Sequence, residues 1–204
     1  MMNGSEDNRL QNTPTERDHS LGPEDAPVTL VEYGNFECIH CKQVFPVIKQ
    51  VRTVLGDNLR FVFRHFPNVK THAHAMRAAE AAEAAGAQGK FWQMHDELFT
   101  HQPALEDRDL TRYARRIGLD VERFARDMAE NAFSAKVQAD YERSLFDEHV
   151  TGTPTIYINE IRHTGGTDFE SLLEAIKQAD TQDRIRLPEK GHGLLSVLDK
   201  LRRR

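Results

Sequence analysis

The stretch VTLVEYGNFECIHCK, residues 28–42, organises the rest of the chain. It opens with an apolar run and continues through a short turn to Cys38 and Cys41, the two cysteines of the sequence. Beyond them, from Val44 to Leu55, apolar residues recur at helical spacing. The pattern predicts a buried strand that turns into a helix, with the Cys-x-x-Cys motif at the turn.

A dithiol at the start of a helix is chemically reactive. The unpaired N–H groups and the positive end of the helix dipole favour the thiolate over the thiol. We expect Cys38, at the helix start, to be the exposed nucleophile and Cys41, one turn further on, to be the buried resolving thiol. When protonated, His40 adds a positive charge within the loop, whereas Glu37 would oppose the thiolate if its carboxylate lay close.

The composition bounds the class of protein. A chain of 204 residues predicts one domain that is large enough to bury its own core. The net charge of -5 gives no reason to expect nucleic acid or an anionic membrane as a partner. No signal peptide is visible at the start of the sequence, and no stretch approaches the roughly 18 apolar residues that span a bilayer. We therefore expect a cytoplasmic location, where a single cysteine pair is more often catalytic or metal-binding than structural.

Two alternatives to a redox dithiol are a zinc half-site and a pair of inert buried thiols. Zinc needs two further ligands, but no second Cys-x-x-Cys exists and the nearest downstream histidines lack the spacing of a zinc finger. Inert thiols would not need the strand-to-helix turn. The sequence therefore favours a redox-active Cys38–Cys41 pair, with no metal and no other cofactor. For the remaining histidines we expect solvated or helix-capping roles: His65, His72, His74, His95, His101, His149 and His163.

Further segments, taken in order, resemble the DsbA-like branch of the thioredoxin superfamily. Thr153 and Pro154, in GTPTIYIN, resemble the cis-proline turn that faces the dithiol in that superfamily. Glu32, six residues before the first cysteine, matches the buried acid of DsbA-like proteins. The FRHFP stretch and the two helical stretches after it resemble the strand end and helical insert of cytoplasmic DsbA-family oxidoreductases. The resemblance covers roughly residues 19–180.

The resemblance implies roles for three of these residues. Pro154 would be cis and would leave the backbone C=O and N–H of Thr153 unpaired near Cys38, where an extended substrate peptide pairs as an added strand. Glu32 would lie buried beneath the dithiol, where burial raises its pKa and lets it trade a proton with Cys41. The residues alone leave two alternatives open, which are an ordinary turn proline at Pro154 and a solvent-edge position for Glu32.

The order of the expected elements gives the fold class. We expect an α/β protein with the thioredoxin fold (βαβ…ββα) and an all-helical insertion, at about residues 71–150, between its two halves. The expected strands cover residues 28–33, 59–65, 155–159 and 161–164, and the helices that flank the insertion cover residues 39–55 and 169–179.

We expect three parts along the chain. Residues 1–18 lack periodicity and are expected to form a flexible arm, and residues 19–180 form the DsbA-like thioredoxin domain. Residues 181–204 form a polar tail in which apolar residues between Leu194 and Leu201 have the spacing of a short amphipathic helix.

The predicted function is that of a protein-disulfide oxidoreductase. Substrates carrying thiols or disulfides, either proteins or small thiols, would pass through a mixed disulfide with Cys38 that Cys41 resolves. An electron donor or acceptor completes the cycle, and the direction of electron flow is open, since Ile39 replaces the proline found in many DsbA-like sites. The alternative is a thioredoxin-fold binding module that docks a partner at the Pro154 edge without turnover. Isomerisation of glutathione adducts is disfavoured, because related enzymes of that kind usually lack the second cysteine.

Overall fold

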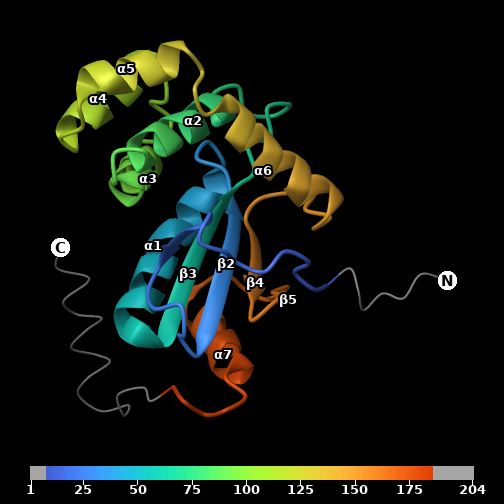
Figure 1. Cartoon of the computed structure of the whole chain (residues 1–204). Coiled ribbons are helices and arrows are strands. Elements are labelled where there is room, and N and C mark those ends of the chain that lie inside the picture. The colour runs from blue at the N-terminus through green and yellow to red at the C-terminus, as the bar shows by residue number, and fades with distance from the viewer. Residues whose placement is uncertain (1–7, 186–204) are drawn as a thin grey trace. The chain divides into compact units, whose positions relative to one another are not determined.

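A five-stranded sheet runs through the fold in the order β1-β3-β2-β4-β5 (Figure 1). The computed structural model describes residues 8–185. Strands β1 and β3 pair antiparallel, with His19 opposite Phe63, and β4 and β5 pair antiparallel through Tyr157 and Arg162. The strands are β1 (His19–Leu21), β2 (Val28–Gly34), β3 (Leu59–His65), β4 (Thr155–Ile158) and β5 (Ile161–Arg162).

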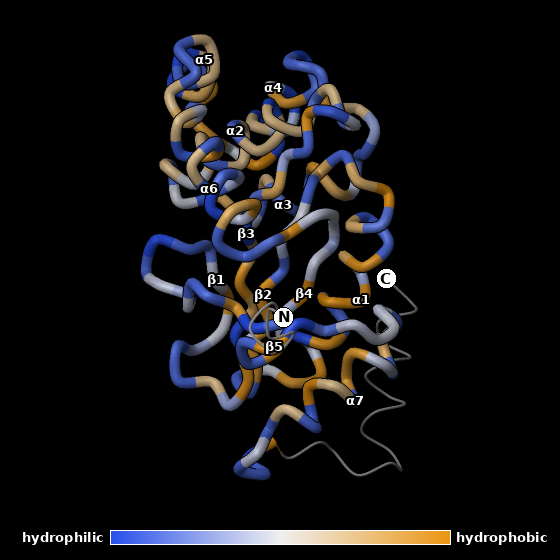
Figure 2. Tube along the Cα trace, turned by 90° about the vertical axis from the view of Figure 1, so that its right-hand side faces the viewer, coloured by the Kyte–Doolittle hydropathy of each residue, from blue (hydrophilic) through white to orange (hydrophobic). Residues whose placement is uncertain are grey.

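The central strands are buried, with apolar residues at most positions and buried polar side chains at Glu32, Arg60, Arg64 and His65. Every residue of β3 and all but one residue of β2 are buried. Strands with apolar side chains on both faces form the middle of a sheet that is covered on both sides. Figure 2 shows apolar residues concentrated along these strands and along α1. The α/β thioredoxin fold predicted from the sequence is therefore confirmed.

The chain divides into two compact units, and the first holds most of the sheet. It comprises residues 43–63 together with the described parts of residues 1–32 and 156–204. Most of α1 (Ile39–Leu55) and all of α7 (Phe169–Ala179) belong to it. Asp168 caps α7 by accepting a hydrogen bond from the Ser171 N–H at 3.0 Å. The apolar faces of both helices are buried: Val44, Ile48, Val51, Leu55, Leu172, Leu173 and Ile176.

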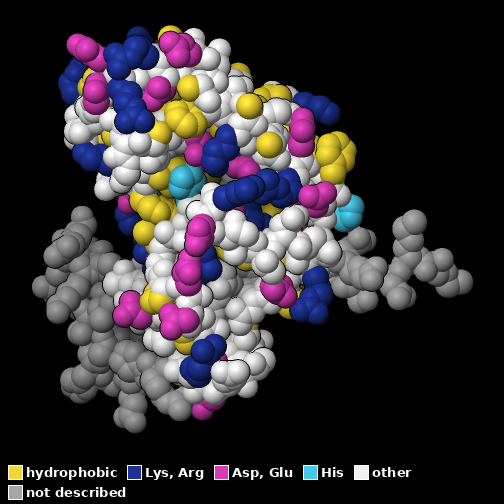
Figure 3. Space-filling model, viewed as in Figure 1, with side chains coloured by type: hydrophobic (Ala, Val, Ile, Leu, Met, Phe, Trp, Pro, Cys, Tyr) yellow, Lys and Arg dark blue, Asp and Glu magenta, His cyan; other side chains and the backbone are white. Residues whose placement is uncertain are grey.

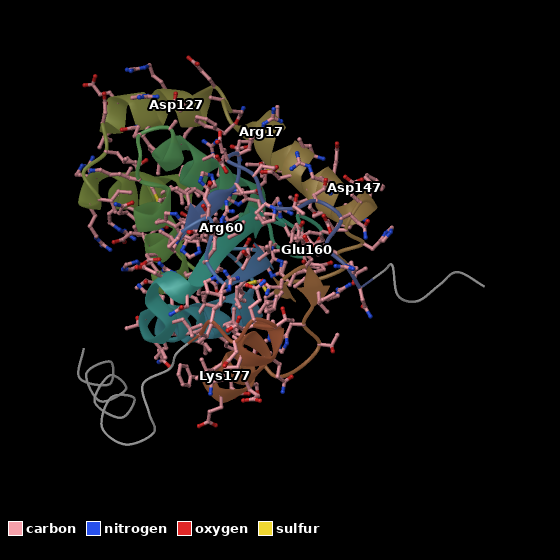
Figure 4. All side chains as sticks on the ribbon, turned by 60° about the horizontal axis from the view of Figure 1, so that its bottom comes forward. Arg17, Arg60, Asp127, Asp147, Glu160 and Lys177 are labelled. Atoms are coloured by element: carbon pink, nitrogen blue, oxygen red, sulfur yellow. The ribbon has the colours of Figure 1, made fainter. Side chains whose placement is uncertain are left out.

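Part of the expected N-terminal arm is held against the sheet. Leu10 is buried, and its N–H donates to the Glu160 C=O at 2.7 Å. Arg9 forms a β-bridge with Ile161. It also forms an ion pair at 3.2 Å with Glu160, which is labelled in Figure 4. No local pattern in the sequence predicts this contact, because it depends on a partner about 150 residues away. The amphipathic pattern between Leu194 and Leu201 lies outside the described residues.

The second unit, residues 33–42 and 64–155, carries the helical insertion. Helix α2 contacts each of the other four helices. Nine of its residues are buried, and most are alanines, whose small side chains let neighbouring helices approach closely. On the face shown in Figure 3, basic and acidic side chains are interspersed over α4 and α5. The helices are α2 (Ala75–Gly86), α3 (Phe91–Thr100), α4 (Asp107–Arg116), α5 (Val121–Ala129) and α6 (Ser134–Phe146).

Within residues 8–185, no helix combines the length and the apolar character needed to cross a membrane.

Candidate active site

The dithiol lies where β2 passes into α1. The Cys38 N–H donates to the Asn35 C=O at 3.0 Å, which closes a four-residue turn, and the Glu37 N–H donates to Asn35 Oδ1 at 2.9 Å. Helix α1 begins at Ile39, and the Lys42 N–H donates to the Cys38 C=O at 3.1 Å. Cys38 therefore stands immediately before the helix, where backbone N–H groups have no partner within the helix.

The two sulfur-bearing residues differ less in exposure than the sequence predicted. Both cysteines are free, Cys41 is fully buried, and Cys38 is only 5% exposed. The expectation of an exposed nucleophile is therefore wrong in degree, although Cys38 is still the more accessible of the pair. The reason is Thr153, whose backbone C=O lies 3.3 Å from Cys38 Sγ and covers it.

Hydrogen bonds lower the pKa of the Cys38 thiol from 9.0 to about 4. The largest contribution is a hydrogen bond from the Cys41 side chain, and burial opposes it by penalising the charged form. The Thr153 side chain and the backbone N–H groups of Cys41 and His40 also stabilise the thiolate. His40 contributes here through its backbone N–H, and its side chain is exposed.

Thr153 makes a different hydrogen bond with each protonation state of Cys38. As a thiol, Cys38 donates to the Thr153 C=O at 3.3 Å, so this carbonyl is not unpaired as predicted. As a thiolate, Cys38 has no proton to donate and instead accepts from the Thr153 side chain. Ionisation of Cys38 therefore frees the Thr153 carbonyl for another donor. The peptide bond between Thr153 and Pro154 is cis.

Glu32 occupies a buried position in β2. Its exposed fraction is 2%, which excludes the solvent-edge alternative and agrees with the burial implied by the resemblance. Its place beneath the dithiol stays a prediction. Its exchange of a proton with Cys41 stays a prediction. Cys41 itself accepts a hydrogen bond at 3.5 Å from the Asn35 N–H.

The loop before α2 holds one side of the dithiol turn. The Glu37 carboxylate accepts from the His74 N–H at 2.7 Å and lies 3.1 Å from His74 Nδ1. The Glu37 carboxylate is thus held at the start of α2. Asn35 Nδ2 lies 3.3 Å from His72 Nδ1. The sequence did not single out these pairings because neither histidine follows a recognisable motif.

Gln102, in the connection between α3 and α4, holds the other side of the turn. Its side-chain Nε2 makes a short hydrogen bond to the Phe36 C=O and another, at 3.2 Å, to the Cys38 C=O. Its backbone C=O accepts from Lys42 Nζ at 3.0 Å. Nothing in its local sequence, HQPALE, indicates this role, because the role depends on residues about 60 positions away.

A buried ionic cluster lies in the same unit. His65 Nε2 and Lys136 Nζ approach the same Glu83 oxygen at 2.9 and 2.8 Å. Burial opposes the charge on Lys136, but the carboxylates of Glu83 and Asp140 raise its pKa above the usual value. The predicted solvated or capping role is wrong for His65, which is buried, and also for His95, which is buried among aromatic rings.

Among residues 8–185, no group of three or more His, Cys, Asp or Glu side chains could hold a metal ion. The absence of a cofactor other than the dithiol stays a prediction.

The sheet order, the helical insertion and a dithiol at the start of α1 define a thioredoxin-fold protein. A family model described as thioredoxin matches residues 14–178, and the chain belongs to this family.

Two curated relatives carry the names of membrane transporters. The Na(+)/H(+) antiporter NhaA 1 of Salinispora arenicola is 43% identical over 171 residues, which is 84% of this chain and 26% of the relative. The Na(+)/H(+) antiporter NhaA 1 of Mycolicibacterium gilvum is 46% identical over 165 residues, covering 79% and 26%. The chain thus spans about a quarter of the length of these relatives.

Similar solved structures include a thioredoxin-like oxidoreductase and proteins named BdbD and alpha-DsbA1. BdbD from Bacillus subtilis, in its oxidised form, aligns with a TM-score of 0.73 at 24% identity, covering 85% of this chain and 98% of that one. A thioredoxin-like oxidoreductase from Silicibacter pomeroyi aligns at 0.71 and 26% identity, covering 81% and 93%. Alpha-DsbA1 from Wolbachia pipientis aligns at 0.71 and 19%, covering 83% and 94%. At identities below 25%, BdbD and alpha-DsbA1 show the fold alone.

Proposed function

We propose that the chain is a thiol–disulfide oxidoreductase that works through Cys38 and Cys41. The observation that carries the proposal is the Cys38 thiol, whose pKa is lowered to about 4 beside a second thiol. Such a thiol is ionised at neutral pH, and the thiolate is the attacking species in disulfide exchange. The similarity to a thioredoxin-like oxidoreductase from Silicibacter pomeroyi and to the thiol-disulfide exchange protein alpha-DsbA2 from Wolbachia pipientis supports the same general chemistry.

The two sulfurs divide the reaction between them. The Cys38 thiolate attacks a substrate disulfide, forms a mixed disulfide and releases one substrate sulfur as a thiolate that takes up a proton. Cys41 loses its proton and attacks Cys38 Sγ, which forms the Cys38–Cys41 disulfide and releases the second substrate thiol. The substrate gains two electrons and two protons; the pair supplies both electrons and the Cys41 proton, and the solvent supplies the second proton. Run in reverse, the same steps oxidise a substrate dithiol.

The stabilised thiolate biases the direction of exchange toward oxidation of the substrate. A thiolate exists only in the reduced form of the pair, so hydrogen bonds to it stabilise that form and make the disulfide more oxidising. At pH 7 the size of this stabilisation is set by the difference between the pH and the Cys38 pKa of about 4, which is about three units. The resulting shift of the reduction potential is at most about 90 mV relative to an unperturbed pair.

Turnover assays separate this proposal from the binding-module alternative. Reduction of insulin by dithiothreitol and reactivation of a scrambled disulfide protein should both be accelerated by the wild-type chain and not by Cys38→Ser. A binding module would give no rate that depends on Cys38, and that result would overturn the proposal.

A second proposal concerns the partner. The identity with named antiporters over most of this chain suggests that the dithiol acts together with a membrane ion transporter. Mixed disulfides captured by a Cys41→Ser variant in cells should then include membrane proteins. Recovery of soluble proteins alone would contradict this partner while leaving the oxidoreductase proposal intact. Fractionation of the same cells would test the cytoplasmic location expected from the sequence.

A further inference from the structure

We propose that Gln102 is a positioning residue for the dithiol, whose side-chain amide fixes the turn from Phe36 to Cys38 by donating to both backbone carbonyls. The inference deepens the proposed oxidoreductase function and rests on it. It gives a reaction role to a glutamine that touches neither sulfur.

The Phe36 carbonyl needs a donor from outside its own turn. Phe36 is 1% exposed, and its ring packs against Phe99 and His95 with centroids 4.9 and 5.7 Å apart. A buried carbonyl without a partner is strongly disfavoured, and Gln102 Nε2 supplies the partner. The same amide reaches the Cys38 carbonyl at 3.2 Å. One planar group therefore fixes two peptide units that lie two residues apart.

The Cys38 carbonyl is the part of this turn that bears most directly on the sulfur. It belongs to the peptide unit just before those that contribute the His40 and Cys41 N–H groups to Cys38 Sγ. It already accepts the first helical hydrogen bond, from the Lys42 N–H. With the second donor from Gln102, this peptide plane is held in one orientation. Rotation of the plane would swing the two N–H groups away from the sulfur and weaken their stabilisation of the thiolate.

The side-chain amide can be removed without disturbing the other contact at this position. Lys42 Nζ binds the backbone carbonyl of Gln102, which every substitution retains. Gln102→Met keeps nearly the length of the side chain and removes only its donors. The effect of this variant therefore reports on the amide alone.

Gln88 provides a matched control in the same unit. It is half-buried like Gln102, and its side chain also makes two hydrogen bonds to backbone groups. Its Nε2 donates to the Asp120 C=O at 3.3 Å, and its Oε1 accepts from the Asp120 N–H at 2.9 Å. These bonds join the end of α2 to the start of α5 and do not involve the dithiol turn. Gln88→Met thus measures the cost of losing such a clamp where no thiol depends on it.

The test is a thiolate titration of the reduced wild type and both variants, followed by absorbance near 240 nm. Gln102→Met should raise the apparent pKa of Cys38 by about one unit or more, whereas Gln88→Met should leave it unchanged. At pH 5 one unit would lower the thiolate fraction from about nine tenths to about one half. At pH 7 the equilibrium constant for reduction of the disulfide by glutathione should fall about tenfold, or about 30 mV.

The outcomes separate this inference from the function on which it rests. An ordinary thiol pKa in the wild type would overturn the proposed function itself. A lowered wild-type pKa that Gln102→Met leaves unchanged would overturn only the positioning role, even if the variant melts at a lower temperature. Should Gln102→Met fail to fold, NMR of the wild type decides, because the Gln102 side-chain amide protons should exchange slowly and shift as Cys38 titrates. Fast exchange and no shift would refute the role.

Discussion

At Cys38, hydrogen bonds and burial act on the thiol in opposite directions, and the hydrogen bonds prevail. Burial alone raises the pKa of a thiol, as it does for any group that becomes negatively charged. Here the Cys41 side chain, the Thr153 side chain and two backbone N–H groups outweigh it and hold the pKa at about 4. The acidity of the site therefore depends on where main-chain atoms lie as much as on which residues flank the cysteine.

This balance gives a specific expectation for His40. Because its contribution to the thiolate comes from the backbone N–H, replacing the exposed side chain should matter little. His40→Ala should leave the apparent pKa of Cys38 within about half a unit of the wild type, a small shift on the scale of protein pKa changes. The measurement is the 240 nm titration of the reduced protein. A rise of a full unit would show that the imidazole charge matters after all.

The division of labour between the cysteines predicts a trapping pattern. Cys41→Ser should accumulate mixed disulfides through Cys38, because attack remains while the resolving step is lost. Cys38→Ser should accumulate few, because the remaining thiol is fully buried. Non-reducing electrophoresis of alkylated lysates checks both variants. Accumulation on Cys41 instead would mean that the two roles are reversed.

Between elements, the Glu83 cluster links the end of β3 to α2 and α6. Glu83 is 4% exposed and receives both His65 and Lys136, so its neutralisation leaves Lys136 without the buried carboxylate that balances its charge. Glu83→Gln should lower the free energy of unfolding by about 2–3 kcal/mol, somewhat below the cost of breaking a fully buried pair because Lys136 is partly exposed. Urea unfolding measures this loss.

Asp140→Asn is the control for the same cluster. It removes two partly exposed ion pairs, with Lys136 at 3.2 Å and with Arg143 at 3.8 Å, and should cost no more than about 1 kcal/mol. Equal losses in the two variants would show that the burial of Glu83 adds nothing to the free energy of unfolding.

The raised pKa of Lys136 makes its contribution to stability depend on pH. This contribution is fully present below the ordinary lysine pKa of 10.5 and is lost as the pH rises through the higher folded value.

Elements with a local pattern were predictable from the sequence, and contacts that depend on distant residues were not. The apolar run and the helical spacing around the dithiol predicted β2 and α1, and α1 has the predicted bounds, Ile39–Leu55. Strand β1 is not among the strands expected from the sequence, since its three residues have no alternating pattern and owe their conformation to pairing with β3.

The same distinction holds within the site. The motif and its place in the fold led to Cys38 and Cys41. Gln102 and the pairing of Glu37 with His74 depend on how loops far apart in the sequence meet, so no local pattern could indicate them. Prediction from sequence thus reaches the reacting atoms more readily than the groups that hold them in place.

For the molecule as a whole, the acidity of Cys38 is also a contribution to stability. In the unfolded chain the thiol has its ordinary pKa near 9.0, and in the folded chain the pKa is about 4. A depressed folded pKa stabilises the folded state fully above pH 9, and the stabilisation is lost as the pH falls through about 4. Only the reduced protein has a Cys38 thiol that can ionise. The stability of the reduced protein relative to the oxidised protein should therefore grow between pH 4 and pH 7.

The growth should be at most about 1.4 kcal/mol per pH unit, which is the value of one unit of pKa difference. Urea unfolding of both redox forms at pH 4, 5.5 and 7 gives the difference directly, with other titrating groups cancelling between the two forms. Reduced Cys38→Ser serves as the control, because it lacks the thiol and should follow the pH dependence of the oxidised wild type. Parallel curves for the two redox forms would mean that folding does not stabilise the thiolate, and the hydrogen bonds around Cys38 would then have no energetic role.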